Sequence, residues 1–270
     1  LNNFFLITTT NTRINHHNII ISFRNRIYII SMEYKERTYR DSFCSGNRRS
    51  FSVKFKETDL WIGVDKDSYS PFMQDEALSI IVKLRNLMDS YLMLDPDYKS
   101  ALVPYYPQTP APQIFHDMSA VCKRTDIGPM SAVAGAVAKY VALELKKKFP
   151  YREIIVENGG DIYLEVTDDI DISVFAGQSP LSNRVGLHIP ASVSPVGVCT
   201  SSGTVGPSLS FGRADAVMIV CKYVLLADSY ATAMANRVKT TADIESVIDY
   251  ISDRSDILGA LIVKDDKMAV

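Results

Sequence analysis

Residues 153–166 read EIIVENGGDIYLEV, two apolar runs that flank Asn158-Gly159-Gly160. An Asn-Gly pair between two strand-like runs is a strong signal for a tight β-hairpin, because both residues tolerate the positive φ that such turns require. Apolar residues also occupy every second position in 51–55 and 60–64, on either side of a turn expected at 57–59. A period of two is typical of half-buried strands, so the sequence predicts two antiparallel hairpins.

The segments outside these hairpins alternate between helical and strand-like patterns. Apolar residues at helical spacing predict helices over about 71–94 and 129–148, and shorter helices at about 227–238 and 243–252. The proline-rich run 103–113 is expected to be an extended connector. Further strands are predicted at 170–176, 184–189, 195–200, 214–222 and 258–264. Strands grouped as hairpins, with helices between the groups, predict an α+β fold with antiparallel sheets.

The composition is that of a globular protein. The 270 residues are 47% hydrophobic and 22% charged, which excludes a disordered or coiled-coil chain. The net charge of -2 supplies no basic field for nucleic acid, and no apolar run approaches the roughly 20 residues that cross a bilayer. Cys44, Cys122, Cys199 and Cys221 are not spaced as a zinc or redox motif, so we expect reduced thiols in a cytoplasmic protein.

Residues 1–31 differ from the rest of the chain. They hold no Asp, Glu or Lys, and the first methionine is Met32. We therefore expect translation to start at Met32 and 1–31 to be a leader outside the fold; the alternative is a genuine N-terminal arm. Residues 32–270 suit a single domain, and without the three arginines of the leader this body is more acidic. An acidic body favours metal-assisted binding of phosphates over binding by basic residues.

Two polar segments offer donors for a ligand. In 157–161, two glycines directly precede Asp161, which lets backbone N–H groups face a ligand, although a plain hairpin turn explains the same residues. In 199–212, nine of fourteen residues are Gly, Ser or Thr. Such a loop offers N–H and hydroxyl donors to an anion, and flexible linkers seldom lie between two strand-like runs. We favour ligand binding over a linker for this loop.

Asp228 and Thr232 are four residues apart in a predicted helix, so both project from one face. A carboxylate and a hydroxyl one turn apart can share Mg²⁺, with ligand phosphates completing its coordination shell. The alternative is that Asp228 caps its own helix while Thr232 packs, and spacing alone favours this alternative. Gly135, in an alanine-rich helix, permits close approach of a backbone or a ligand, and packing on a sheet is the commoner cause.

The order of these segments resembles that of the ApbE superfamily, whose characterised members are FAD:protein FMN transferases, and most of all its short archaeal and bacterial branch. The resemblance covers about Lys35 to the C-terminus. The runs that carry it are GPMSAVAGA at 128–136, VENGGDIYL at 156–164, GVCTSSGTVG at 197–206, SLSFGRADAV at 208–217 and ADSYATAMAN at 227–236.

The resemblance implies an ApbE-like, T-fold-type α+β fold in one domain, with FAD or FMN between the helix at 128–149 and the loop at 199–212. It implies Mg²⁺ ligands at Asp228 and Thr232, with Ser131 as a third candidate. It also suggests Asp126 as a flavin contact. Together with the two polar segments, the candidate ligand-binding residues are Asp126, Gly159, Gly160, Thr200, Ser201, Ser202, Gly203 and Thr204. The candidate catalytic residues are Asp161 and, for a sulfur-handling role, Cys199.

One motif of the transferases is missing. They carry a His-x-x-Asp-Pro-x-Thr-Gly run after the Thr-Ser-Gly loop, whereas residues 207–213 read PSLSFGR. Three functions therefore stay open: Mg-dependent transfer of a flavin or nucleotide, an accessory role in sulfur assimilation or cofactor metabolism through Cys199, and non-catalytic binding on the same fold. A small-molecule nucleotide is the expected partner, and a homo-oligomer is compatible with the sequence.

Overall fold

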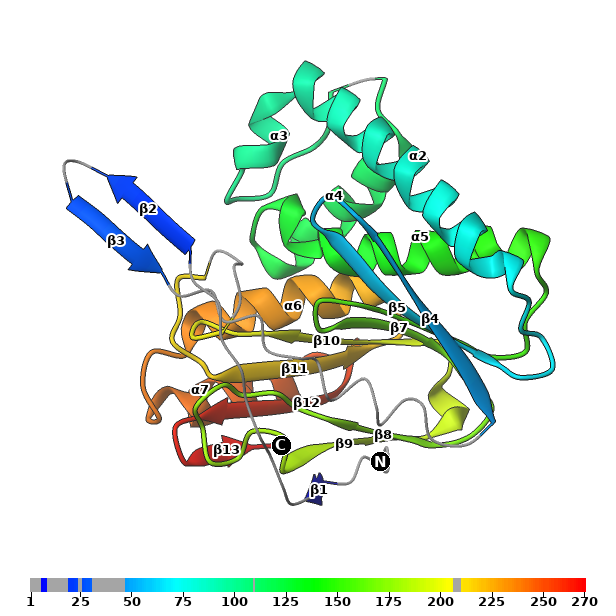
Figure 1. Cartoon of the computed structure of the whole chain (residues 1–270). Coiled ribbons are helices and arrows are strands. Elements are labelled where there is room, and N and C mark those ends of the chain that lie inside the picture. Colours follow the sequence, from blue (N-terminus) through cyan, green and yellow to red (C-terminus); the bar gives the residue numbers. More distant parts are fainter. Residues whose placement is uncertain (1–5, 9–18, 24–25, 31–46, 109, 206–209) are drawn as a thin grey trace.

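The computed structural model describes residues 6–8, 19–23, 26–30, 47–108, 110–205 and 210–270. Its central feature is an antiparallel sheet of eight strands (Figure 1). From one edge to the other the strands are β13 (Lys267–Ala269), β12 (Ile257–Lys264), β11 (Ala216–Cys221), β10 (Val196–Ser201), β7 (Asp161–Glu165), β6 (Ile154–Asn158), β5 (Thr58–Asp65) and β4 (Arg48–Phe55). The sheet is built from four pairs of strands that follow each other closely in the sequence: β4–β5, β6–β7, β10–β11 and β12–β13. Most of its strand pairing is therefore local.

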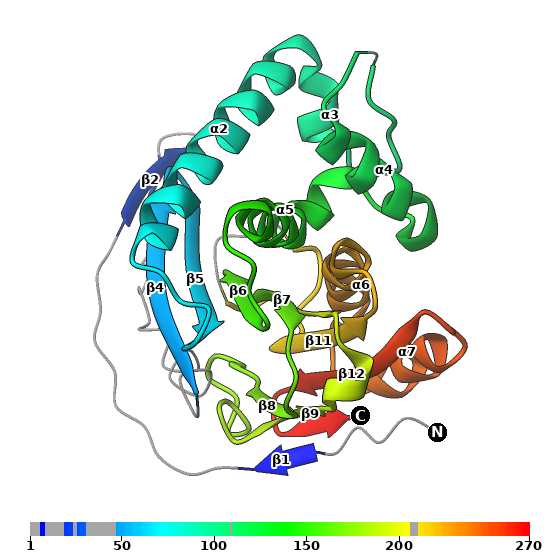
Figure 2. The same ribbon diagram turned by 90° about the vertical axis from the view of Figure 1, so that its right-hand side faces the viewer.

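Helices cover one face of the sheet in two layers (Figure 2). The inner layer holds α5 (Val133–Lys148), which packs on β6 and β7, and α6 (Val224–Arg237), which packs on β10 and β11. Outside them lie α2 (Phe72–Leu94), α3 (Pro96–Ser100) and α4 (Gln113–Thr125), while α7 (Asp243–Ser252) packs on β12. A 3₁₀ turn, η1 (Pro129–Ala132), leads directly into α5.

The opposite face of the sheet is covered by a second, smaller sheet. This sheet consists of β8 (Ile170–Ser173), β9 (Val185–Ile189) and β1 (Leu6–Thr8), with β9 in the centre. The central strands of the large sheet are therefore buried on both faces, whereas the edge strand β4 keeps alternate residues exposed. The run EIIV in the opening hairpin follows from this position, because Ile154 and Val156 join the core under the helices and Ile155 joins the core under the small sheet.

The predicted fold class is confirmed: antiparallel sheets packed with helices form a single α+β domain. The first turn lies at Lys56–Glu57 rather than at 57–59, because Phe55 pairs with Thr58 and Lys56 takes a positive φ of 54°. The connector after α3 is extended as predicted, but it ends in α4, a helix that the sequence reading did not predict.

The described residues of the N-terminal segment form strands. Within it, β1 pairs with β9, and β2 (Ile19–Phe23) pairs with β3 (Arg26–Ile30). The other residues of 1–31, and Met32 itself, lie outside the described residues, so the leader at 1–31 and the start at Met32 stay predictions. Across the described ranges, no helix is both long and apolar enough to cross a membrane. The cytoplasmic location also stays a prediction.

Candidate functional site

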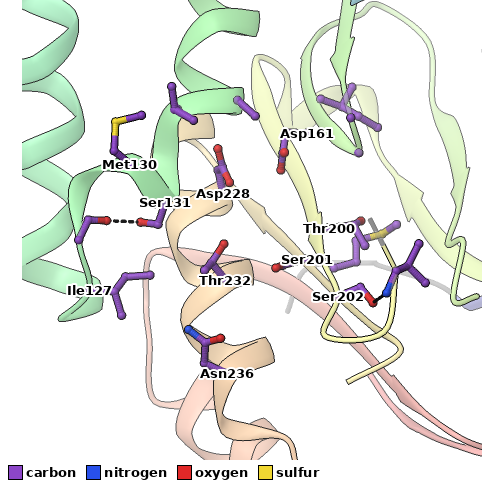
Figure 3. A pocket seen from close by; sticks show the side chains of 18 of the residues that line it. Ile127, Met130, Ser131, Asp161, Thr200, Ser201, Ser202, Asp228, Thr232 and Asn236 are labelled. Carbon is purple, nitrogen blue, oxygen red and sulfur yellow. Dashed lines mark hydrogen bonds between the residues drawn. The ribbon is translucent and has the colours of Figure 1, made fainter. Parts of the chain in front are cut away.

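A cavity of about 550 Å³ opens between η1, the first turn of α5, helix α6, the β6–β7 turn and the end of β10 (Figure 3). These elements meet because β7 and β10 are neighbours in the sheet and α6 packs on β10. Nine of the thirteen residues predicted for the site line this cavity: Ser131, Gly159, Gly160, Asp161, Thr200, Ser201, Ser202, Asp228 and Thr232.

The β6–β7 turn carries Asp161 into the cavity. Gly159 and Gly160 have φ values of 69° and 103°, a region that side-chain-bearing residues rarely adopt, which explains the two glycines in the turn. The backbone N–H of Gly160 donates to the buried Glu157 carboxylate (2.7 Å), and Asn158 donates to the backbone oxygen of Ala134 in α5 (3.1 Å). The turn is thus held both internally and by the neighbouring helix.

Asp228 ties helix α6 to the start of helix α5. Because α6 begins at Val224, Asp228 lies one turn inside its helix and does not cap it. Its Oδ2 instead accepts a hydrogen bond from the backbone N–H of Gly135 across the helix pair (2.8 Å). The alternative in which Asp228 caps its own helix is therefore wrong, and the carboxylate satisfies a backbone donor in the first turn of α5.

The close approach permitted by Gly135 is to another helix. A Cβ atom at this position would lie 3.1 Å from the backbone oxygen of Val224 and 3.2 Å from the Cβ of Asp228. Packing on the sheet, the commoner cause favoured from the sequence, is therefore not the reason for this glycine. Its small size brings α5 against α6 and allows the Gly135–Asp228 hydrogen bond to form.

Two buried carboxyl groups lie next to each other in the cavity (Figure 3). Asp161 and Asp228 are only 9% and 6% exposed. Burial raises the pKa of Asp228 to about 7, although the hydrogen bond from Gly135 acts in the opposite direction. Burial, followed by the charge on Asp228, raises the pKa of Asp161 well above its usual range. Lys99 is the one cationic side chain among the described lining residues, so the pair has little charge compensation.

The donor set suits a hard cation such as Mg²⁺. Carboxylate and hydroxyl oxygens from Asp161, Asp228 and Thr232 line the same cavity, and oxygen is the ligand atom that Mg²⁺ prefers. The described residues contain no group of three or more His, Cys, Asp or Glu side chains that could hold a metal. Any cation here would therefore complete its shell with hydroxyls, water or ligand phosphates. Two adjacent buried carboxyl groups gain most from such a neutralising charge.

Four predicted residues do not line the cavity. Cys199 has no exposed surface, and burial raises its pKa well above the usual thiol range. Asp126 is exposed and ends α4 in a left-handed conformation. In the polar loop, the N–H of Gly203 donates to the backbone oxygen of Ala214 (2.8 Å), and Thr204 donates to Asp215 (2.8 Å). These last two contacts hold the loop against the neighbouring strand.

The sequence reading missed several lining residues. Asn236 lies one turn after Thr232, so the spacing of four that links Asp228 to Thr232 extends to it and could have identified it. Its Oδ1 accepts from the backbone N–H of Phe211 (2.8 Å), whose ring is 53% exposed and also lines the cavity. Lys99 belongs to a helix that was not predicted, so no local signal pointed to it.

The fold and the cavity define an α+β protein with an acidic, hydroxyl-rich cavity between a helix pair and an antiparallel sheet. The chain belongs to the ApbE superfamily: the family described as AbpE bacteria matches residues 41–267. The motifs at 128–136, 156–164 and 227–236 supply the walls of the cavity.

Two relatives illustrate the similarity in sequence. The chain is 34% identical over 222 residues to a UPF0280 protein of Methanocella arvoryzae, covering 82% of this chain and 88% of the relative. It is 37% identical over 195 residues to a UPF0280 protein of Methanothrix thermoacetophila, covering 72% and 81%. Among solved structures, the apo flavinyl transferase ApbE of Pseudomonas stutzeri matches 82% of this chain and 92% of its own, with a TM-score of 0.47 and 13% identity.

Proposed function

We propose that the cavity binds a flavin nucleotide, or a similar phosphate-bearing ligand, together with Mg²⁺. The observation that carries this proposal is the adjacency of the buried carboxyl groups of Asp161 and Asp228 in a cavity rich in hydroxyl groups. Such a pair attracts a divalent cation, and a cation held at Asp228 keeps coordination positions for phosphate oxygens. Membership of the ApbE superfamily supports a relationship to flavin transferases.

Different walls of the cavity would serve different parts of the ligand. Asp228 and Thr232 would hold Mg²⁺, which when bound supplies charge neutralisation at a phosphoryl oxygen. The glycine turn at 159–160 and the hydroxyl groups of 200–202 offer polar contacts for phosphates. Apolar side chains at another part of the lining suit a flat ring system: Leu102, Ile127, Met130 and Phe211.

The corresponding activity is transfer of FMN from FAD to a hydroxyl group. The acceptor oxygen would bond to the FMN phosphorus while the bond to AMP breaks, and the hydroxyl proton would pass to the Asp161 carboxylate. The second candidate is binding without turnover, favoured by the absence of histidine among the described lining residues and of the transferase His-x-x-Asp-Pro run from the chain. The burial of Cys199 gives a sulfur-handling role no support.

A thermal-shift experiment with FAD, with and without MgCl₂, tests the proposal. At a ligand concentration of about one hundred times Kd, binding stabilises a protein by about 2.7 kcal/mol, so we expect Tm to rise by about 5–10 °C with FAD and Mg²⁺. Asp228→Asn keeps an acceptor for the Gly135 N–H but removes the charge, and it should abolish the Mg-dependent part of the shift.

The matched control is Asp249→Asn, because this carboxylate is exposed on α7, outside the cavity. It should retain the full shift. An unchanged Mg-dependent shift in Asp228→Asn would contradict the metal assignment, and no FAD-dependent shift in the wild-type protein would contradict the proposed ligand. Release of AMP with an acceptor protein would separate transfer from binding alone.

A further inference from the structure

Three hydroxyl groups form a continuous hydrogen-bonded chain behind the cavity. Thr125 Oγ1 lies 2.7 Å from Ser229 Oγ, which lies 2.9 Å from Ser131 Oγ. Thr125 ends α4, Ser229 follows Asp228 in α6, and Ser131 belongs to η1, so the chain joins three elements. Ser229 is fully buried and Thr125 is 4% exposed, whereas Ser131 lines the cavity beside Asp228 and Thr232 (Figure 3).

Backbone carbonyl groups terminate this chain at both ends. At the cavity end, Ser131 Oγ lies 2.7 Å from the backbone oxygen of Gly128, and at the buried end Thr125 Oγ1 lies 3.3 Å from the backbone oxygens of Val121 and Cys122. A carbonyl can only accept, and each hydroxyl carries one proton. The three protons serve four contacts, so one contact holds none. The contact of Thr125 with α4 is the longest, and the 2.7 Å contact between Ser131 and the Gly128 oxygen needs a proton between its two oxygens, so the protons run from Thr125 towards Gly128.

This order uses the single proton of Ser131. Thr125 donates to Ser229, Ser229 to Ser131, and Ser131 to Gly128. The Ser131 oxygen accepts one hydrogen bond, keeps one lone pair, and has no proton for a ligand in the cavity.

The geometry points to Ser229 and Thr125 as positioning residues that hold Ser131 as an acceptor-only oxygen at the cavity wall. Resting on the proposed function, this assigns Ser131 to the cation rather than to a phosphate: its remaining lone pair can meet Mg²⁺, whereas it has no hydrogen to donate to a phosphate oxygen. Because Ser229 directly follows Asp228, one turn of α6 then carries a carboxylate for the cation and the group that orients a second oxygen.

Mg²⁺ titrations of a double-mutant cycle test this inference. We expect Ser131→Ala to weaken Mg²⁺ binding about tenfold, as for other losses around metal sites, and Ser229→Ala to weaken it by several-fold. Ser229→Ala in the Ser131→Ala background should cause no further loss, because Ser229 acts through Ser131. The affinity for FAD without Mg²⁺ should stay unchanged in all three variants. Calorimetry with MgCl₂, and separately with FAD, gives both affinities.

Two controls separate positioning from a general loss of stability. Ser119→Ala removes another buried hydroxyl of α4, which bonds Tyr98 and not the chain, and should leave Mg²⁺ affinity unchanged. Thr125→Val serves if Ser229→Ala does not fold: it should lower Mg²⁺ affinity less than Ser131→Ala does, and Thr125→Ser should restore it. An equal loss from Ser229→Ala in both backgrounds would overturn the positioning role.

The failure of this inference and that of the proposed function are distinguishable. If the wild-type protein binds FAD and Mg²⁺ while Ser131→Ala leaves Mg²⁺ affinity intact, the assignment of Ser131 is wrong and the proposed function stands. If Ser131→Ala weakens FAD binding without Mg²⁺, Ser131 contacts the ligand directly and the acceptor-only assignment is overturned. If the wild-type protein binds neither, both are wrong.

Discussion

At the residue scale, two consecutive side chains of α6 organise the site. The Asp228 carboxylate accepts from the backbone of α5 at Gly135, and the Ser229 hydroxyl reaches Ser131 in η1. Both residues are therefore bonded to the segment that begins at Gly128, almost one hundred residues earlier in the chain. A substitution of Asp228 or Ser229 is therefore expected to affect both α6 and the opposite wall of the cavity.

The carboxyl pair should make the metal-free protein less stable as pH rises. Both pKa values are raised in the folded state, Asp228 to about 7 and Asp161 well above the usual value, so the folded protein holds protons that the unfolded chain has released. Stability from this source is present below about pH 4 and is lost as pH rises towards and through the folded values. Each retained proton contributes a slope of about 1.4 kcal/mol per pH unit.

Urea unfolding at several pH values between 5 and 8, with EDTA, checks this sign. Asp161→Asn should show a flatter decline than the wild type. The hydrogen bond to Asp171 raises the pKa of His188, so the stability that protonated His188 contributes is also lost as pH rises. This loss is the same in the wild type and in the variant. Parallel pH profiles for wild type and variant would show that Asp161 ionises normally in the fold.

At the element scale, Gly135 lets α5 and α6 approach each other closely beside the cavity. Gly135→Ala places a methyl group 3.1 Å from a backbone oxygen of α6, so the helices must separate by a few tenths of an ångström. We expect a cost of about 1–3 kcal/mol, partly offset by the better helix propensity of alanine, which is about 1 kcal/mol. The urea midpoint gives the change in the free energy of unfolding.

A second readout links this contact to the site. Because Gly135 donates to Asp228, the variant should also lose part of its Mg-dependent thermal shift. Ser246→Ala, at an exposed position of α7, is the control for helix propensity and should change stability by less than about 0.5 kcal/mol. A Gly135→Ala protein as stable as the wild type would mean that the two helices adjust without strain.

Elements with a strong local pattern were predictable from the sequence, and elements defined by distant contacts were less so. The hairpin at 153–166 was predictable, but its turn is Gly159–Gly160 rather than Asn158–Gly159, because Asn158 pairs with Asp161. The period-two strands fix their own hairpin, and α2 lies where its apolar spacing placed it. Helix α4 carries apolar residues at helical spacing, such as Ile114, Phe115 and Met118, but directly follows a proline-rich run that reads as extended. Its helical spacing is the signal that could have found it.

The same division holds for the site. The spacing of four placed Asp228 and Thr232 on one helix face, and both line the cavity. The hydrogen bond between Gly135 and Asp228 could not be predicted from the sequence, because it joins residues 93 positions apart. Resemblance to the ApbE superfamily supplied the grouping of segments that spacing alone does not give, but it also placed Asp126 in a site that the structure forms without it.

At the scale of the whole molecule, burial of the central strands of the large sheet on both faces decides which groups are accessible. Cys199 and Cys221 belong to the core beneath the helices, and Cys122 is also fully buried. Burial raises the pKa of Cys122 to about 12, and burial also raises the pKa values of Cys199 and Cys221 well above the usual thiol range. These thiols can become nucleophiles only when the core opens, so their chemistry reports on the stability of the entire domain.

Alkylation of a Cys44→Ser protein should therefore be limited by unfolding. With iodoacetamide and mass spectrometry of peptides, we expect Cys122, Cys199 and Cys221 to react at least about a thousandfold more slowly in native buffer than in concentrated urea, because the opened fraction of a stable domain is about 10⁻³ or less. All three should react at similar native rates if global opening exposes them together. Selective, rapid modification of Cys199 would contradict this expectation, because it would require an opening at the cavity that leaves the rest of the core closed, and it would restore the case for a sulfur-handling thiol.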